Sequence, residues 1–181
     1  MTDSLKVIGF SGSLRKDSYN SAVLRELGRL APARVSLEIA DWRHVPVYDA
    51  DLELPAVVAD LKRQVADADA VLIVTPEYNY GIPGGLKNVL DWLSRPAFES
   101  VFAHKPVGVM SVSPGATGGA RAQAQLKNVL LSMVAQVFPH PEVAIGAARE
   151  RVVEGRIARE DTEKLLRGYM QRFGEWAART R

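Results

Sequence analysis

The sequence contains no cysteine, and this absence removes several kinds of chemistry at once. Without thiols the chain forms no disulfide, binds no metal through thiolate, and has neither a cysteine nucleophile nor a dithiol redox pair. Its three histidines, His44, His104 and His140, lie far apart without the spacing of metal ligands, so we expect no metal site. Any redox activity of this protein would therefore depend on a bound cofactor.

Long apolar runs are also missing. The longest apolar stretches, such as Ala70–Val74, have the length of a strand, whereas a membrane span needs about 20 apolar residues. Met1–Lys6 contains no apolar segment of the kind found in secretory signals. We therefore expect a cytoplasmic protein with no membrane association.

A strong charge of either sign is missing as well. The formal net charge is +2, and the isoelectric point is near 9.0. In the stretch Arg149–Arg181, arginines alternate with acidic residues, which is typical of a solvated helix face rather than of a surface that binds nucleic acid. We therefore expect no nucleic-acid partner.

The sequence does contain enough apolar material for one folded domain. Its length of 181 residues is that of a single domain, and 47% of its residues are hydrophobic. No internal repeat, low-complexity tract or linker divides the chain, so we expect one domain over residues 1–181.

Short apolar runs alternate with segments of helical periodicity along the chain. Strands buried on both faces of a parallel sheet are uniformly apolar, and a helix usually connects one such strand to the next. The predicted strands are Leu5–Phe10, Val35–Ala40, Ala70–Val74, Pro106–Val112 and Val143–Ile145. The predicted helices are Ser18–Leu30, Pro55–Ala66, Gly84–Leu93, Ala120–Ala135 and Glu160–Ala178. This alternation predicts an α/β fold, in which a doubly wound parallel sheet is covered by helices on both faces.

Polar loops rich in glycine and proline follow the first, third and fourth predicted strands. Open parallel sheets bind ligands outside the carboxyl ends of their strands, where the strand order reverses. We therefore expect these three loops to converge on one crevice.

The loop after the first strand carries the donors that a phosphate requires. Its hydroxyl and amide donors are Ser11, Ser13, Ser18 and Asn20, and Arg15 adds a charged planar fork. The alternative is an ordinary turn in which Ser18 is the N-cap of the next helix. The loop has neither the Walker spacing nor the Gly-x-Gly-x-x-Gly spacing, which disfavours a nucleoside triphosphatase or a common dehydrogenase.

The other two loops suit a planar ligand. The loop Thr75–Gly85 combines two prolines and three glycines with Tyr78 and Tyr80, whose rings offer flat surfaces. The loop Ser113–Gly119 has the flexibility to place backbone amides along the edge of a ligand. The alternatives are a loop that packs its tyrosines on its own core, and a glycine-rich connection that serves only to turn the chain.

These loops, with the helix after the second one, strongly resemble the motifs of the NADPH-dependent FMN reductase family. That family includes chromate and quinone reductases and relatives of the azoreductases. The matching residues are Gly12-Ser13-Leu14-Arg15-Lys16, Ser18 and Asn20; then Pro76-Glu77-Tyr78-Asn79-Tyr80-Gly81-Ile82-Pro83-Gly84, Leu86-Lys87-Asn88 and Asp91-Trp92; and finally Ser113, Gly115, Gly118-Gly119 and Arg121.

The resemblance implies a flavodoxin-like fold, with a five-stranded parallel sheet in the order 2-1-3-4-5 and non-covalently bound FMN. The phosphate of FMN would be held by Ser11, Ser13, Arg15, Ser18 and Asn20. The isoalloxazine would be surrounded by Pro76, Glu77, Tyr78, Asn79 and Gly81, with Ser113, Gly115 and Gly119 near its other edge. Backbone amides of Tyr78–Gly81 and Gly115–Gly119 would stabilise negative charge on the reduced ring.

The resemblance also implies a reaction. NADPH or NADH would transfer a hydride to FMN, and the same site would then reduce an acceptor in a ping-pong cycle. Free flavin, quinones, azo compounds and chromate are the acceptors left open. The chemistry would belong to FMN, with no side chain acting as a covalent nucleophile.

Family members form homodimers through the helix that corresponds to Leu86–Trp92, and some form homotetramers. In the tetramers an arginine, a tyrosine and a glutamate make contacts between dimers. Arg121 and Glu142 stand at two of these places, but Ala124 stands at the place of the tyrosine. The sequence therefore favours a homodimer more strongly than a homotetramer.

Three alternative functions are consistent with the same motifs. The first is a flavodoxin that carries electrons without reacting with NAD(P)H, although such carriers usually have an acidic face. The second is an FMN-based redox sensor, and the third is an interaction module that binds no FMN.

Overall fold

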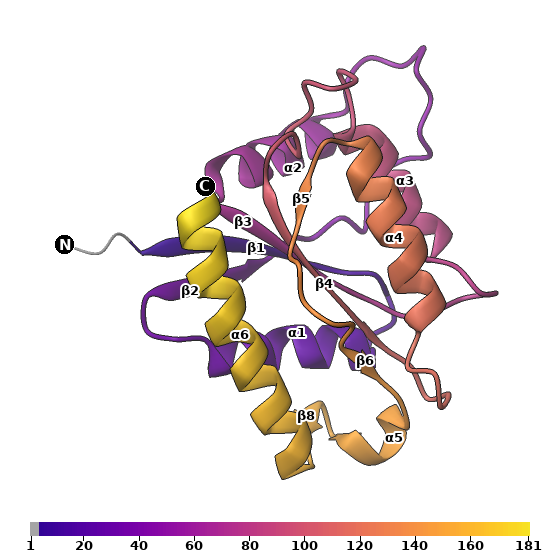
Figure 1. The fold of residues 1–181 in the computed structure, drawn as a ribbon. Helices are drawn as coiled ribbons and strands as arrows, with labels where there is room; N and C mark the ends of the chain where they lie inside the picture. Colours follow the sequence, from indigo (N-terminus) through magenta and orange to yellow (C-terminus); the bar gives the residue numbers. More distant parts are fainter. Residues whose placement is uncertain (1–3) are drawn as a thin grey trace.

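The computed structural model describes residues 4–181, which form a parallel sheet between two layers of helices (Figure 1). The strands of the sheet lie in the order β2-β1-β3-β4-β5, with β6 also paired to β4. Their bounds are β1 (Leu5–Ser11), β2 (Val35–Ile39), β3 (Ala70–Thr75), β4 (Pro106–Val112), β5 (Gln136–Val137) and β6 (Ala144–Ile145). The predicted order 2-1-3-4-5 and the three-layer α/β class are thereby confirmed.

The central strands are buried because their residues are apolar on both faces. Every residue of β3 and of β4 is buried, whereas the edge strand β2 is mostly exposed, with only Val35 buried. Continuous burial is the property expected of parallel strands that have helices above and below them.

The helices divide between the two faces of the sheet (Figure 1). Two of them, α1 (Tyr19–Leu30) and α6 (Glu160–Thr180), pack on one face; α2 (Ala56–Asp67), α3 (Gly84–Leu93) and α4 (Ala120–Ser132) pack on the other. Among residues 4–181, no helix is long and apolar enough to cross a membrane.

The predicted helix Ala120–Ala135 is too long by three residues. Helix α4 ends at Ser132, and Val134 has a φ of 60°, a left-handed conformation that ends the helix. The chain then turns directly into β5, which the sequence analysis did not predict.

The predicted strand Val143–Ile145 contains β6, but it shares the fifth position of the sheet with the short strand β5, which was not predicted. β5 pairs with the start of β4, and β6 pairs with its end. Between them lies a segment with Pro139 and Pro141, which have no amide hydrogen for a ladder. Gln123 of α4 supports the start of β6, because its Nε2 donates to the carbonyl of Val143 at 2.9 Å and to Ser111 Oγ at 2.8 Å.

A small hairpin before α6 was also not predicted. Helix α5 (Ala148–Arg151) leads into β7 (Val152–Val153) and β8 (Arg156–Ile157), joined by Glu154 and Gly155 with φ values of 48° and 74°. The hairpin is anchored to α1, since Arg156 Nη1 lies 2.9 Å from Oε1 of the buried Glu26.

Both described ends of the chain meet at Asp69, at the amino end of β3. The amide of Lys6 donates to Asp69 Oδ2 at 2.8 Å, and Arg181 Nη1 lies 2.9 Å from Asp69 Oδ1. The amino ends of the strands are therefore tied together by one carboxylate, opposite the loops at their carboxyl ends.

Candidate functional site

The loops after β1, β3 and β4 converge at the carboxyl ends of these strands, as predicted. The amide of Gly12 donates to the carbonyl of Val74 at 2.8 Å, and Tyr78 Oη lies 3.5 Å from Ser13 Oγ. These contacts join the first and second loops. Arg121 Nη1 lies 2.8 Å from Glu77 Oε1, which joins the second loop to the start of α4.

The first loop is held in shape by its own hydroxyl groups. Ser11 Oγ lies 2.8 Å from Ser21 Oγ and accepts a hydrogen bond from the amide of Ser13. Ser18 is the N-cap of α1, and its Oγ accepts from the amide of Ser21. Ser18 thus has the capping role considered as the alternative, and its position at a helix N-terminus is compatible with a bound anion.

Asn20 is buried and connects α1 to the end of β4. Its Nδ2 donates to the carbonyl of Val112 at 3.2 Å, whereas its Oδ1 has no hydrogen-bond partner within residues 4–181. A buried unpaired oxygen is unfavourable unless a donor reaches it. The free atom is an acceptor, and it suits a ligand hydroxyl better than an ionised phosphate.

The second loop contains a tight turn over Tyr78–Gly81. The amide of Tyr78 donates to the carbonyl of Gly81, and the amide of Gly81 donates to that of Tyr78, at 2.9 and 3.0 Å. Asn79 and Tyr80 have φ values of 51° and 68°, as in a type I′ turn. Of the four predicted amide donors, those of Tyr78 and Gly81 are therefore used within the turn. Within residues 4–181, the amides of Asn79 and Tyr80 have no partner.

Glu77 stabilises the start of α4. Its Oε2 accepts hydrogen bonds from the amides of Arg121 and Ala122 at 3.1 and 3.4 Å, in addition to the ion pair with the Arg121 guanidinium. Burial raises the pKa of Glu77, but the side-chain hydrogen bond from Arg121, the backbone amides and the Arg121 charge together lower that pKa below its usual value. The carboxylate is thus ionised and fixed, with both oxygens occupied.

Gln125 of α4 holds the other side of the turn. Its Oε1 accepts from the amide of Ile82 at 2.6 Å, and a side chain at Gly81 would meet the same oxygen. The sequence analysis missed Gln125, because a glutamine on an exposed helix position gives no signal of such a contact.

The third loop depends on glycine at two positions. Gly118 and Gly119 have φ values of 62° and 90°, and a Cβ on Gly118 would lie 2.6 Å from the backbone of Ala144. Gly115 differs from them, because a Cβ there would meet only Ser113 Oγ, at 3.6 Å. The backbone of Gly115 therefore leaves room for a ligand.

Two further residues, Trp42 and Asn88, hold the loops around the site through hydrogen bonds. Trp42 is buried against Gly85 and donates from Nε1 to the carbonyl of Ser11 at 3.0 Å, at the start of the first loop. Asn88 holds the loop after β2, since its Nδ2 donates to the carbonyl of Pro46 and its Oδ1 accepts from the amide of Tyr48. The motif around Asn88 is thus structural in this chain.

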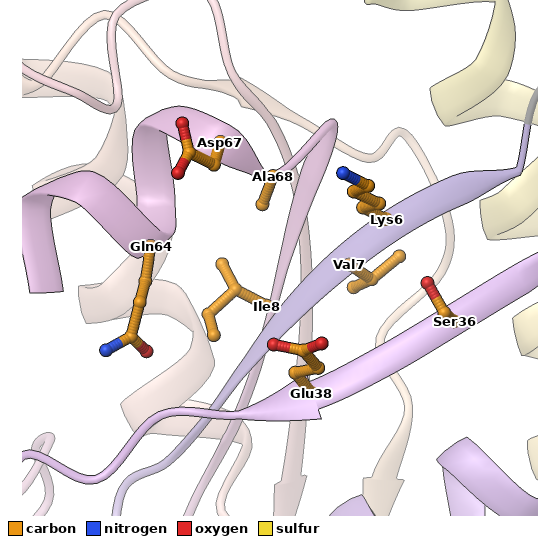
Figure 2. Close-up of a pocket in the computed structure, with 8 residues that line it drawn as sticks. All are labelled: Lys6, Val7, Ile8, Ser36, Glu38, Gln64, Asp67 and Ala68. Atoms are coloured by element: carbon orange, nitrogen blue, oxygen red, sulfur yellow. The ribbon is translucent and has the colours of Figure 1, made fainter.

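One surface hollow contains predicted site residues, and another lies away from them. One of about 450 Å³ includes Ser11, Ser13 and Arg15 of the predicted phosphate loop, and extends past the buried Trp42. Figure 2 shows a different hollow of about 230 Å³, formed by β1, β2 and the end of α2. Its lining, which includes Lys6, Glu38 and Asp67, contains none of the predicted site residues.

The donor set fits FMN. Buried hydroxyls at the start of α1 suit the phosphate, the unpaired Asn20 Oδ1 suits a hydroxyl of the ribityl chain, and the free amides of Asn79 and Tyr80 suit the polar edge of the ring. The sheet order and the converging loops define a flavodoxin-like protein, a fold in which ligands bind where the strand order reverses.

Comparison with known proteins identifies the family. The chain matches the family model for NADPH-dependent FMN reductases over residues 5–150. It is 40% identical to an NAD(P)H-dependent FMN reductase of Pseudomonas aeruginosa and 41% identical to a quinone reductase of Escherichia coli K12, over the whole of both chains in each case. The solved structure of FerB, a flavoenzyme NAD(P)H:(acceptor) oxidoreductase from Paracoccus denitrificans, has a TM-score of 0.90 and 37% identity, covering 97% of this chain and 98% of that one.

The chain therefore belongs to the NADPH-dependent FMN reductase family, a family of enzymes that use FMN and NAD(P)H. The expected family, fold, cofactors and enzymatic character are confirmed. The alternative of a non-enzymatic flavodoxin-type carrier is not supported.

Proposed function

We propose that residues 1–181 act as one FMN-binding domain that uses NAD(P)H to reduce small-molecule acceptors, with quinones and flavins as the principal class. The main support from the structure is that a loop rich in hydroxyl groups meets a rigid turn with two free amides, in contact at Ser13 and Tyr78. The relatives named as FMN and quinone reductases support the same acceptor class. Azo compounds and chromate are further acceptors that an open crevice would admit.

The residues proposed to contact FMN are those predicted from the sequence. The phosphate end would be formed by Ser11, Ser13, Arg15, Ser18 and Asn20. The ring would be bordered by Pro76, Glu77, Tyr78, Asn79 and Gly81 on one side and by Ser113, Gly115 and Gly119 on the other. Since both carboxylate oxygens of Glu77 are occupied, its contribution would be to hold α4 and the turn in place rather than to contact the ring.

FMN held by these residues would supply the redox chemistry, the transfer of a hydride from NAD(P)H and of two electrons to the acceptor. The protein would orient the flavin and stabilise negative charge on its ring. The amides of Asn79 and Tyr80 are available for this, because the turn leaves them unpaired within the described residues. Tyr78, whose hydroxyl lies near Ser13 Oγ, would separate the phosphate end from the ring end.

We further propose a homodimer in the cytoplasm, the compartment in which NAD(P)H is available. Arg121 and Glu142, which stand at two of the positions that contact a second dimer in tetrameric relatives, have partners within the chain. Arg121 pairs with Glu77, and Glu142 lies 2.6 Å from Lys127 Nζ. With Ala124 at the third position, these pairs favour the dimer over the tetramer.

An anaerobic absorbance titration of the FMN-loaded protein tests the proposed function. Addition of NADPH, and of NADH in a separate sample, should bleach the flavin band, and a quinone should restore it. A bound flavin that neither nucleotide bleaches would contradict the proposal. The rates with the two nucleotides also give the preferred electron donor.

A further inference from the structure

Tyr80 has an unusual combination of exposure and restraint. Its side chain is 73% exposed, yet its backbone has a φ of 68°, which is costly for a residue other than glycine. An exposed ring on a strained backbone requires other contacts to hold it in one position.

Those contacts come from Arg121. The guanidinium carbon of Arg121 lies 4.4 Å from the centre of the Tyr80 ring, in a cation–π contact. The same guanidinium is fixed by its 2.8 Å ion pair with Glu77, whose side chain is only 10% exposed. Glu77 is in turn held by the first amides of α4. The ring is thus linked to a helix terminus through two charged side chains.

Tyr78 and Tyr80 lie toward opposite ends of the proposed site. Tyr78 points toward the first loop, where its hydroxyl meets Ser13 Oγ. Tyr80 lies instead with Arg121, at the start of α4 and beside the third loop. A flavin whose phosphate is held by the first loop extends its ring toward the second and third loops, so Tyr80 stands at the end where an acceptor would approach.

We propose that Arg121 is a positioning residue that fixes Tyr80 as a wall at the acceptor end of the crevice, and that this wall limits the size of the acceptor. The inference rests on the proposed function. Arginine is suited to the task because its planar fork stacks on the ring while its edge pairs with the carboxylate, which lysine cannot do in the same way.

The test compares the reduction of a small and a large quinone by five variants of the FMN-loaded protein. Tyr80→Leu and Arg121→Met remove the ring and its restraint, and the double variant removes both. Tyr80→Phe keeps the ring. Lys127→Met is the matched control, because it also breaks an ion pair of α4, the one with Glu142. The acceptors are 1,4-benzoquinone and anthraquinone-2-sulfonate.

We expect kcat/KM for the anthraquinone, relative to benzoquinone, to rise about fivefold in Tyr80→Leu and in Arg121→Met. The double variant should show no further increase, because the two residues act as one unit. Tyr80→Phe and Lys127→Met should match the wild-type protein. A ratio unchanged in Arg121→Met, or additive effects in the double variant, would overturn the proposal.

One measurement without turnover completes the test. Hydrogen exchange of the peptide that covers the turn should accelerate in Arg121→Met but not in Lys127→Met. Unchanged exchange in Arg121→Met would show that Arg121 does not act through the turn. Failure of the proposed function alone would instead appear as a wild-type flavin that NAD(P)H does not bleach.

Discussion

At the scale of single residues, two arginines near the crevice have opposite environments. Arg121 is paired with Glu77 and stacked on Tyr80. Arg15 is exposed, and no carboxylate of residues 4–181 lies within ion-pair distance of its guanidinium. An arginine without a carboxylate partner beside a helix N-terminus keeps its full charge for an anionic ligand.

The substitution Arg15→Ala should therefore weaken FMN binding more than turnover. We expect the dissociation constant of FMN to rise about tenfold, the effect of losing one hydrogen bond to a charged group. The maximal rate at saturating FMN should stay near that of wild type. Fluorescence titration with FMN and steady-state assays measure the two quantities. Arg179→Ala, on the exposed last turn of α6, is the control, and a normal FMN affinity in Arg15→Ala would remove Arg15 from the site.

Glu77 should make the stability of the protein depend on pH. Its pKa in the folded protein lies below the ordinary value of 4.5, so its contribution is fully present above that pH and is lost as the pH falls through the folded value. Glu77→Gln should lower the free energy of unfolding at neutral pH by about 1 kcal/mol, a small value because Arg121 is half exposed. The difference from wild type should shrink as the pH falls below 4.5 and through the lowered pKa of Glu77. Urea unfolding over a series of pH values from neutral to acid checks this, and a pH-independent difference would contradict it.

The sequence predicted which loops come together, but not how their residues pair. A run of serines and one arginine after an apolar strand predicts an anion site from the chemistry of the donors alone. The Glu77–Arg121 pair joins residues 44 positions apart in the chain, so only the fold brings them together. The use of the Tyr78 and Gly81 amides within the turn depended on the φ values of Asn79 and Tyr80, which their residue types did not determine.

At the scale of elements, the strands with continuous apolar sequence were predicted almost to the residue. The predicted Pro106–Val112 coincides with β4, and the predicted Ala70–Val74 differs from β3 only by Thr75. The predicted strand Val143–Ile145 contains β6, whereas β5 has only two residues before a proline-containing segment and was not predicted. Backbone hydrogen bonds hold both strands to β4, and the side chain of Gln123 adds contacts to Ser111 and Val143.

Gln123→Met should therefore destabilise the protein, although methionine is apolar and similar in size to glutamine. The buried hydroxyl of Ser111 would lose the hydrogen bond from Gln123, and leaving a buried polar group unpaired costs about 1–3 kcal/mol. The carbonyl of Val143 would keep its bond from the amide of Ser111. Gln171→Met, on the exposed face of α6, should change the free energy of unfolding by less than about 0.5 kcal/mol. Equal effects of the two substitutions in denaturant unfolding would show that the bridge of Gln123 is dispensable.

At the scale of the whole molecule, the proposed dimer would use the face of α3 that points away from the core. Leu86, Val89 and Leu90 of this helix are already buried within the chain, whereas Gly84 and Gly85 are exposed. Asn88 and Trp92 hold the loop after β2 against α3 through the carbonyl of Pro46. Any contact with a second copy would therefore involve the start of α3 and this loop.

Gly84→Arg should shift the protein from dimer to monomer. A Cβ at Gly84 has no atom within 4 Å, so the arginine fits the chain itself, whereas a charged side chain in an interface core is unfavourable. Sedimentation equilibrium should give a monomer mass for this variant and a dimer mass for the control Ala178→Arg, which adds the same charge to α6. A dimer that persists in Gly84→Arg would place the interface elsewhere.

The meeting of the chain's two described ends at Asp69 has a practical consequence for attaching the protein to a surface. These ends lie near the amino ends of β1 and β3, and the loops of the proposed site follow the carboxyl ends of β1, β3 and β4 (Figure 1). A molecule tethered through its C-terminus to an electrode would present its proposed cofactor end to the solution. Soluble nicotinamide and acceptor could then reach it freely, while direct electron exchange with the support would have to cross the length of the sheet.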